Sequence, residues 1–115
     1  MSRTLIISTG LHGADGSPYN PANLRLLHAL VTRLRDSITG QGATCFFDGT
    51  GAGIYDGKSE PARTLIFGDI PDTKRARATV DYAIDHHVRA VCGGHPFGQD
   101  SVAVTWGDTK LVEWD

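Results

Sequence analysis

Polar and histidine side chains stand beside glycines in three short segments of the sequence, where a ligand could be bound. The segments Ser8–Gly13, Asp48–Gly53 and Gly93–Asp100 combine glycine with groups that form hydrogen bonds. Glycine lets backbone N–H groups approach a ligand closely and form concavities for anions. The side chains that we expect to bind a ligand in these segments are Thr9, His12, Asp48, Thr50, His95 and Gln99. Turn and hairpin geometry is the alternative explanation of the glycines.

The same polar residues could serve catalysis or bind a metal, but no known motif orders them. The sequence contains no Gly-x-Ser-x-Gly, no His-x-Ser/Thr and no His-Glu-x-x-His. Cys92 and His95 have a metal-ligand spacing, but only His12 is an obvious further ligand, so we expect no metal and no cofactor. His28 and His87 fall on or beside apolar helix stripes, where we expect hydrogen-bonded structural histidines. A binding protein is therefore expected rather than an enzyme, with a hydrolase or transferase that uses His12 and His95 as the alternative.

Basic residues are concentrated in the two segments that we expect to be helical, although the formal net charge of the chain is −2. Lys74, Arg75 and Arg77 come at the start of the second of these segments, where a helix dipole disfavours cations. We treat them as a candidate patch for an anion or an acidic partner. A solvated helix face with ion pairs one turn apart is the alternative. Nucleic acid is not expected, because no aromatic side chains are interleaved with these arginines.

The elements that must position these residues follow from hydrophobic periodicity. Strands are predicted over residues 4–9, 43–48, 62–67 and 102–106, and helices over residues 21–39 and 73–92. Asn20 and Pro21 form a helix start signal, and Gly40 and Gly42 form a stop signal. The order β-α-β-β-α-β is typical of the ferredoxin-like fold, in which two helices cover one face of a four-stranded antiparallel sheet. Residues 110–114 are an optional fifth strand at an edge, and the 115 residues are expected to form a single α+β domain over residues 1–115.

Three of the predicted strands carry bulky apolar residues on both faces: Leu5-Ile6-Ile7, Cys45-Phe46-Phe47 and Leu65-Ile66-Phe67. A sheet with one solvated face should instead alternate between apolar and polar residues. We therefore expect the open face to be covered, by a second copy in a homodimer or by a partner protein. The alternative is that the terminal strand and the glycine-rich segments fold across it.

Composition gives the expected location of the protein. No apolar run approaches the roughly 20 residues of a membrane span, and no signal segment opens the chain. Only two cysteines are present, which does not suggest a disulfide scaffold. We expect a cytoplasmic protein that has no membrane partner.

Two segments resemble short proteins of actinobacteria and their phages. Phe97–Val104 with the following Thr105-Trp106-Gly107 is similar to a strand near the C-terminus of those proteins, and Gly49–Gly51 with Gly57–Glu60 is similar to their mid-chain hairpin. The resemblance implies a compact accessory protein and carries no activity with it. We expect a small non-enzymatic protein that binds an anionic, nucleotide-like ligand or a host protein, in the host cytoplasm if phage-encoded, with counter-defence as the concrete role. A structural virion or assembly component is the further alternative.

Overall fold

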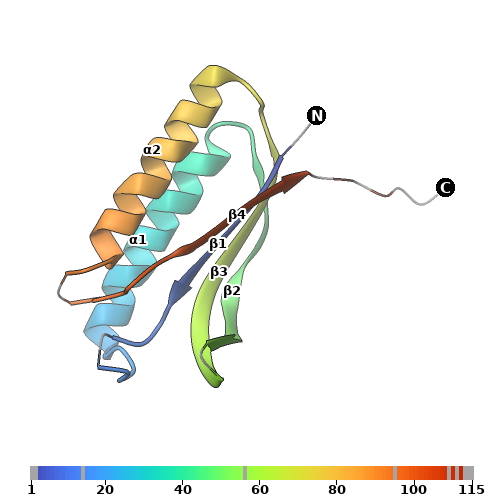
Figure 1. Cartoon of the computed structure of the whole chain (residues 1–115). Helices are drawn as coiled ribbons and strands as arrows, with labels where there is room; N and C mark the ends of the chain where they lie inside the picture. Colours follow the sequence, from blue (N-terminus) through green and yellow to red (C-terminus); the bar gives the residue numbers. More distant parts are fainter. Residues whose placement is uncertain are drawn as a thin grey trace.

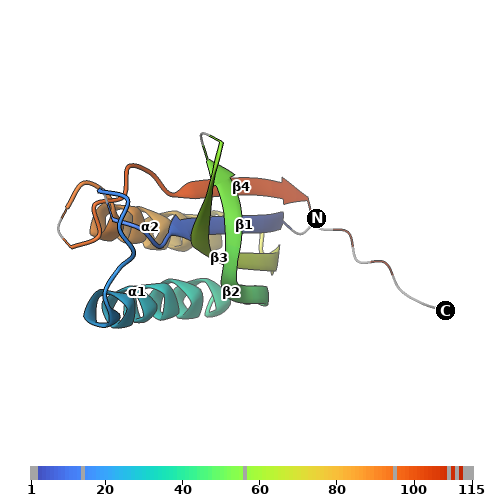
Figure 2. The same cartoon turned by 90° about the horizontal axis from the view of Figure 1, so that it is seen from below.

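The computed structural model describes residues 3–13, 15–55, 57–94, 96–108, 110 and 112. The elements along the chain are β1 (Arg3–Gly10), α1 (Pro21–Thr39), β2 (Thr44–Tyr55), β3 (Lys58–Ile70), α2 (Lys74–Val91) and β4 (Ala103–Asp108). The strands form one sheet in the order β2-β3-β1-β4, and all neighbouring strands are antiparallel. Figures 1 and 2 show both helices on the same face of this sheet. The predicted ferredoxin-like βαββαβ fold is confirmed.

The ends of both helices follow from local capping. The side chain of Asn20 accepts a hydrogen bond from the backbone N–H of Asn23 at 2.8 Å, and Pro21 occupies the first turn of α1. The backbone N–H of Gly40 caps the other end of α1, as the sequence predicted. α2 begins one residue after the predicted start at residue 73, because the hydroxyl of Thr73 accepts a hydrogen bond from the backbone N–H of Ala76 at 3.1 Å and makes Thr73 the N-cap.

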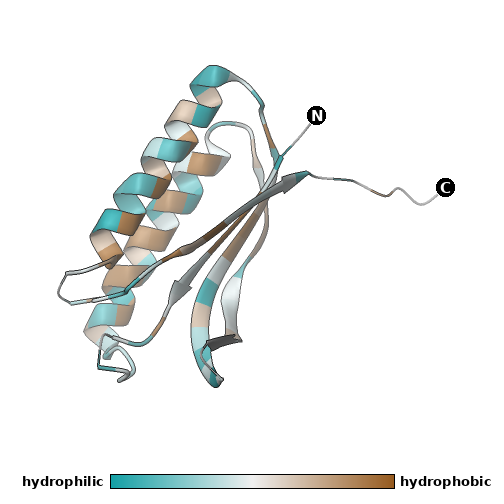
Figure 3. Ribbon diagram, in the orientation of Figure 1, coloured by the Kyte–Doolittle hydropathy of each residue, from teal (hydrophilic) through white to brown (hydrophobic). Residues whose placement is uncertain are grey.

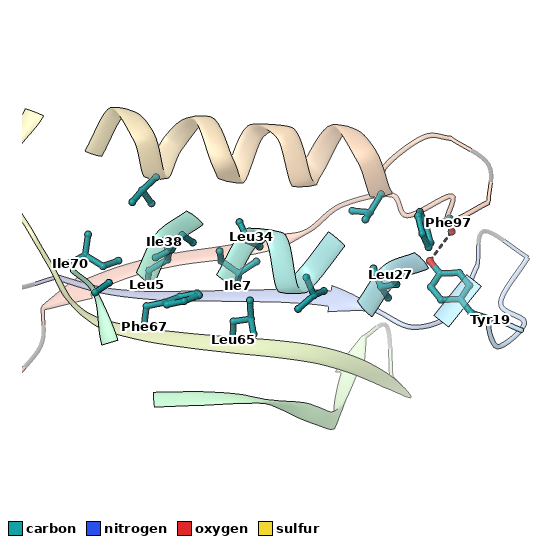
Figure 4. Close-up of a cluster of buried hydrophobic side chains, with 14 residues drawn as sticks. Leu5, Ile7, Tyr19, Leu27, Leu34, Ile38, Leu65, Phe67, Ile70 and Phe97 are labelled. Atoms are coloured by element: carbon teal, nitrogen blue, oxygen red, sulfur yellow. Dashed lines mark hydrogen bonds between the residues drawn. The ribbon is translucent and has the colours of Figure 1, made fainter. Parts of the chain in front are cut away.

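The hydrophobic core lies between the helices and the face of the sheet that they cover (Figure 4). In Figure 3 the apolar residues recur along both helices and along the central strands. One stripe of α1 and alternate positions of β1 and β3 supply most of the core: Leu27, Val31, Leu34, Ile38, Leu5, Ile7, Leu65 and Phe67. These residues carry the three-and-four spacing of a helix or the alternation of a strand, so the sequence could place them.

β2 and β3 are longer than the sequence predicted, and the glycine-rich segment 49–53 is part of β2 rather than a loop. β2 is an edge strand that pairs only with β3, and glycine weakens such a strand without preventing it. Gly49 also has a packing role, because a Cβ atom there would lie 2.8 Å from Cζ of Phe47. The turn between the strands contains Gly57, whose φ of +75° suits glycine. The backbone of residues 49–53 is therefore extended in the sheet and does not form the expected cradle of N–H groups.

The expected edge strand over residues 110–114 falls mostly outside the described residues. Of this segment only Lys110 and Val112 are described, and neither lies in a strand. Among the described residues, no helix combines the length and the apolar character that crossing a bilayer requires.

Candidate functional site

A cavity of about 270 Å³ lies between α1 and α2. Each helix contributes lining residues that recur at three- and four-residue spacing along one side. Its lining comes from α1 (Leu30, Arg33, Leu34 and Ser37) and from α2 (Thr79, Tyr82, Ala83, His86 and His87). The lining thus combines apolar walls with hydroxyl groups, two imidazoles and one guanidinium, and it contains no carboxylate. Such a mixture of apolar surface and a few polar groups is typical of small-molecule sites.

His87 is the most unusual residue of this cavity, because it is only 4% exposed. Its Nε2 atom lies 2.9 Å from Oγ1 of Thr9 on β1, which is also buried. Its Nδ1 atom has no hydrogen-bond partner among the described residues. Burial, with a smaller contribution from the neighbouring His86, lowers the pKa of His87 to about 4. At neutral pH the ring is therefore uncharged, and its Nδ1 atom is buried without a hydrogen-bond partner.

The Thr9–His87 pair has the distance of a nucleophile and its base, but its chemistry favours binding. A hydroxyl nucleophile needs a base whose pKa is near the working pH. The lowered pKa of His87 makes it a weak base at pH 7, and Thr9 is only 2% exposed. A neutral imidazole with an unpartnered nitrogen can instead donate or accept one further hydrogen bond. Sequence reasoning singled out Thr9 and expected a hydrogen-bonded structural role for His87, and the structure joins the two.

Asp48, a predicted ligand-binding residue, is held by two arginines. Its Oδ1 accepts from Nε of Arg63 at 2.6 Å and its Oδ2 from Nη1 of Arg35 at 2.7 Å. The hydrogen bond from Arg63, followed by that from Arg35, lowers the pKa of the Asp48 carboxyl. Nη1 of Arg63 also lies 3.2 Å from Nδ1 of His28, and Thr50 pairs with Arg63 across the strands. These contacts connect α1 to β2 and β3, and both oxygens of the Asp48 carboxylate are already hydrogen-bonded.

Gln99, another predicted ligand-binding residue, joins three parts of the chain. Its Nε2 lies 3.1 Å from the carbonyl oxygen of Gly10, 2.6 Å from that of His12, and within hydrogen-bonding distance of the Tyr19 hydroxyl. The Tyr19 hydroxyl in turn donates to the carbonyl oxygen of Phe97 at 2.8 Å (Figure 4). The amide of Gln99 thus holds the end of β1 against the segments that follow β1 and α2.

The predicted site residues therefore lie in three places rather than one. Thr9 contacts the cavity residue His87, whereas Asp48 and Thr50 lie on β2. Because β3 separates β2 from β1, the backbones of Thr50 and Thr9 are about 10 Å apart. His12 follows β1 near Gln99, and His95 lies outside the described residues. A ligand site formed by all six residues stays a prediction.

The residues of the predicted basic patch at the start of α2 lie in different environments, one packed within the fold and two exposed to solvent. The guanidinium of Arg77 lies over the ring of Trp106, 4.1 Å from its centroid, and that of Arg3 lies 5.8 Å from the same ring. Lys74 and Arg75 are exposed. Arg77 therefore has a partner within the fold, which explains its tolerance near a helix N-terminus. A role for this patch in binding an anion or a partner stays a prediction.

Sequence reasoning missed several residues that matter in the structure. Arg63 stands two residues before Leu65, so strand alternation could have placed it on the helix-covered face. Arg33, Tyr82 and His86 had no comparable signal, because their role depends on which sides of the two helices face each other.

Comparisons with known proteins found similarity only among solved structures. No protein-family model matches the sequence, and no curated protein matches it. Among solved structures, the chain is similar to a phage SAM lyase in complex with S-methyl-5'-thioadenosine. The two sequences are 18% identical, the alignment covers 93% of this chain and 81% of that chain, and the TM-score is 0.49.

Proposed function

We propose that the protein binds a small anionic, nucleotide-like ligand in the cavity between α1 and α2. The observation that carries this proposal is a buried, neutral imidazole with an unpartnered nitrogen, that of His87, in a cavity that also holds Arg33 and no carboxylate. Buried polar atoms without partners are rare in folded proteins, and a ligand is one of the groups that can satisfy them.

The chemistry of the lining suggests how such a ligand is held. When Nε2 of His87 carries the ring proton and donates to Thr9, Nδ1 accepts a hydrogen bond from an N–H group of the ligand. The side chains of Leu30 and Leu34 offer apolar contact to a ring, and Tyr82 offers an aromatic face. Arg33 then pairs with the anionic group.

The volume of the cavity limits the size of the ligand. Sites for drug-sized molecules usually enclose about 300–1,000 Å³, and this cavity of about 270 Å³ is just below that range. We infer that a mononucleotide fits better than a dinucleotide. Sequestration of a nucleotide signal in this way would be compatible with a counter-defence role.

Calorimetry with two related compounds tests the proposal. Adenosine 5′-monophosphate is compared with S-methyl-5'-thioadenosine, which has the same base but no phosphate. We expect the monophosphate to bind more tightly. Arg33→Gln should weaken its binding about 10- to 100-fold, because a hydrogen bond to a charged group is lost. Arg25→Gln, which changes an exposed arginine on the same helix outside the cavity lining, should leave the affinity unchanged.

Two results would count against this function. If none of the four ribonucleoside monophosphates binds, or if Arg33→Gln binds as tightly as the natural sequence, the cavity is not the anion site. Mass spectrometry of the incubated mixtures tests catalysis at the same time, because turnover of a nucleotide would favour the hydrolase or transferase alternative. Recovery of the protein with viral particles would favour the virion or assembly alternative.

A further inference from the structure

The open face of the sheet, on the side away from the helices, carries no charged residue over the main part of the sheet. In this part, residues 3–10, 44–51, 62–68 and 103–107, the positions that face away from the helices hold Ile, Phe, Ser, Thr, Ala and Gly. The charged residues Arg3, Asp48 and Arg63 share the helix-covered face with Leu5 and Leu65. A sheet face that remains in water normally shows the opposite distribution, with its charges outward.

Two phenylalanines are directed to this same open face by an irregularity in β2. The pairing of β2 with β3 shifts between Cys45 and Phe47, so consecutive residues do not alternate there. A Cβ atom at Gly68, which faces away from the helices, would overlap the Phe46 ring. A Cβ atom at Gly49 would meet the Phe47 ring. Both rings therefore lie on the open face against glycines, and Phe46 and Phe47 remain 51% and 46% exposed.

Hydroxyl groups supply most of the remaining polarity of this face. Oγ of Ser8 and Oγ1 of Thr64 lie 2.8 Å apart near the centre of this face. Thr105 on β4 pairs with Ile6 on β1. A hydroxyl both donates and accepts, so it can pair with another hydroxyl, whereas a carboxylate or an ammonium group cannot pair with its own kind.

We propose that a second copy of this chain covers the open face, so that two sheets pack through Phe46, Phe47, Ile6 and Ile66 around the Ser8–Thr64 pair. A two-fold contact lays one surface patch on itself, which is favourable only where like charges do not meet. An uncharged face of aromatic, aliphatic and hydroxyl groups meets this condition. It offers no charge to recognise an acidic or basic partner. Figure 2 shows both helices on the other side of the sheet. The cavity that they line is therefore independent of the dimer contact.

Multi-angle light scattering after size exclusion tests this proposal. We expect the natural sequence to have twice the 12.3 kDa mass of the chain at micromolar concentration. Thr64→Arg places a cation at the centre of the patch in both copies and should weaken the dimer at least about 100-fold. Leu26→Arg adds the same charge at an exposed position of α1 and should leave the dimer intact. Circular dichroism of both variants checks that they are folded.

A monomeric mass of the natural sequence across micromolar concentrations would overturn the proposal. So would a folded Thr64→Arg variant that dimerises as strongly as the natural sequence, because the contact would then lie elsewhere. If Thr64→Arg fails to fold, Phe47→Ser gives the second test, with the same monomeric outcome expected. A natural sequence that elutes only with a different protein would also overturn it.

Discussion

Acid should destabilise this protein in a pH range that His87 determines. Burial lowers the pKa of His87 to about 4 in the folded chain, against an ordinary value of 6.5. Between these values the unfolded chain binds a proton that the folded chain does not, so stability falls as the pH falls. The free energy of unfolding should decrease by about 2 kcal/mol from pH 7 to pH 5 and by about 3 kcal/mol from pH 7 to pH 4.

Asp48 affects stability in a different pH range. Its pKa is lowered from 3.8 by its arginine partners, so its stabilising contribution is present above pH 3.8 and is lost as the pH falls below that value. A loss of stability between pH 6.5 and pH 4 therefore reports mainly on His87, and a further loss at lower pH reports on Asp48.

Urea denaturation from pH 7 to pH 4 measures the effect. His87→Gln removes the titrating group and should remove the loss of stability above pH 4. His86→Gln, at the exposed neighbouring position, should retain it. If the natural sequence keeps its stability from pH 6.5 to pH 4.5, or if His87→Gln loses as much as the natural sequence, the reasoning is refuted. A resonance of the His87 ring that titrates near pH 6.5 would refute it directly.

Three further predictions test the packing. Gly68→Ala should lower the free energy of unfolding by about 1–3 kcal/mol, because the added methyl group would overlap the ring of Phe46. Gly51→Ala has open space around it and should change the free energy of unfolding by no more than about 0.5 kcal/mol. Equal urea midpoints of the two variants would contradict this. Gln99→Leu should cost about 1–3 kcal/mol and speed amide exchange in residues 11–19, and unchanged exchange would argue against its joining role. Arg77→Ala should cost about 0.5–2 kcal/mol and shift tryptophan fluorescence, and an unshifted spectrum would exclude the stacked arrangement.

Local features of the sequence could predict the order of the helices and strands and the approximate positions of most of their ends. The cap at Asn20 and the apolar stripe from Leu27 to Ile38 act within four residues along the chain, and alternation acts between next neighbours in a strand. These interactions are short in range, so they are visible without the fold. The same rules underestimated β2 and β3, because cross-strand pairing extends both strands through a segment of low strand propensity.

The sequence by itself therefore determined the βαββαβ order and the apolar stripes of the helices that enter the core. It also determined that three strands carry apolar residues on both faces. Only the tertiary structure decided that His87 meets Thr9, 78 residues away, and that Arg63 meets Asp48 across a strand pair. It also decided which sides of α1 and α2 enclose a cavity, and that an irregularity in β2 turns Phe46 and Phe47 to one face. The physical reason is that these contacts depend on helix rotation and strand register, which are set by packing of the whole core rather than by neighbouring residues.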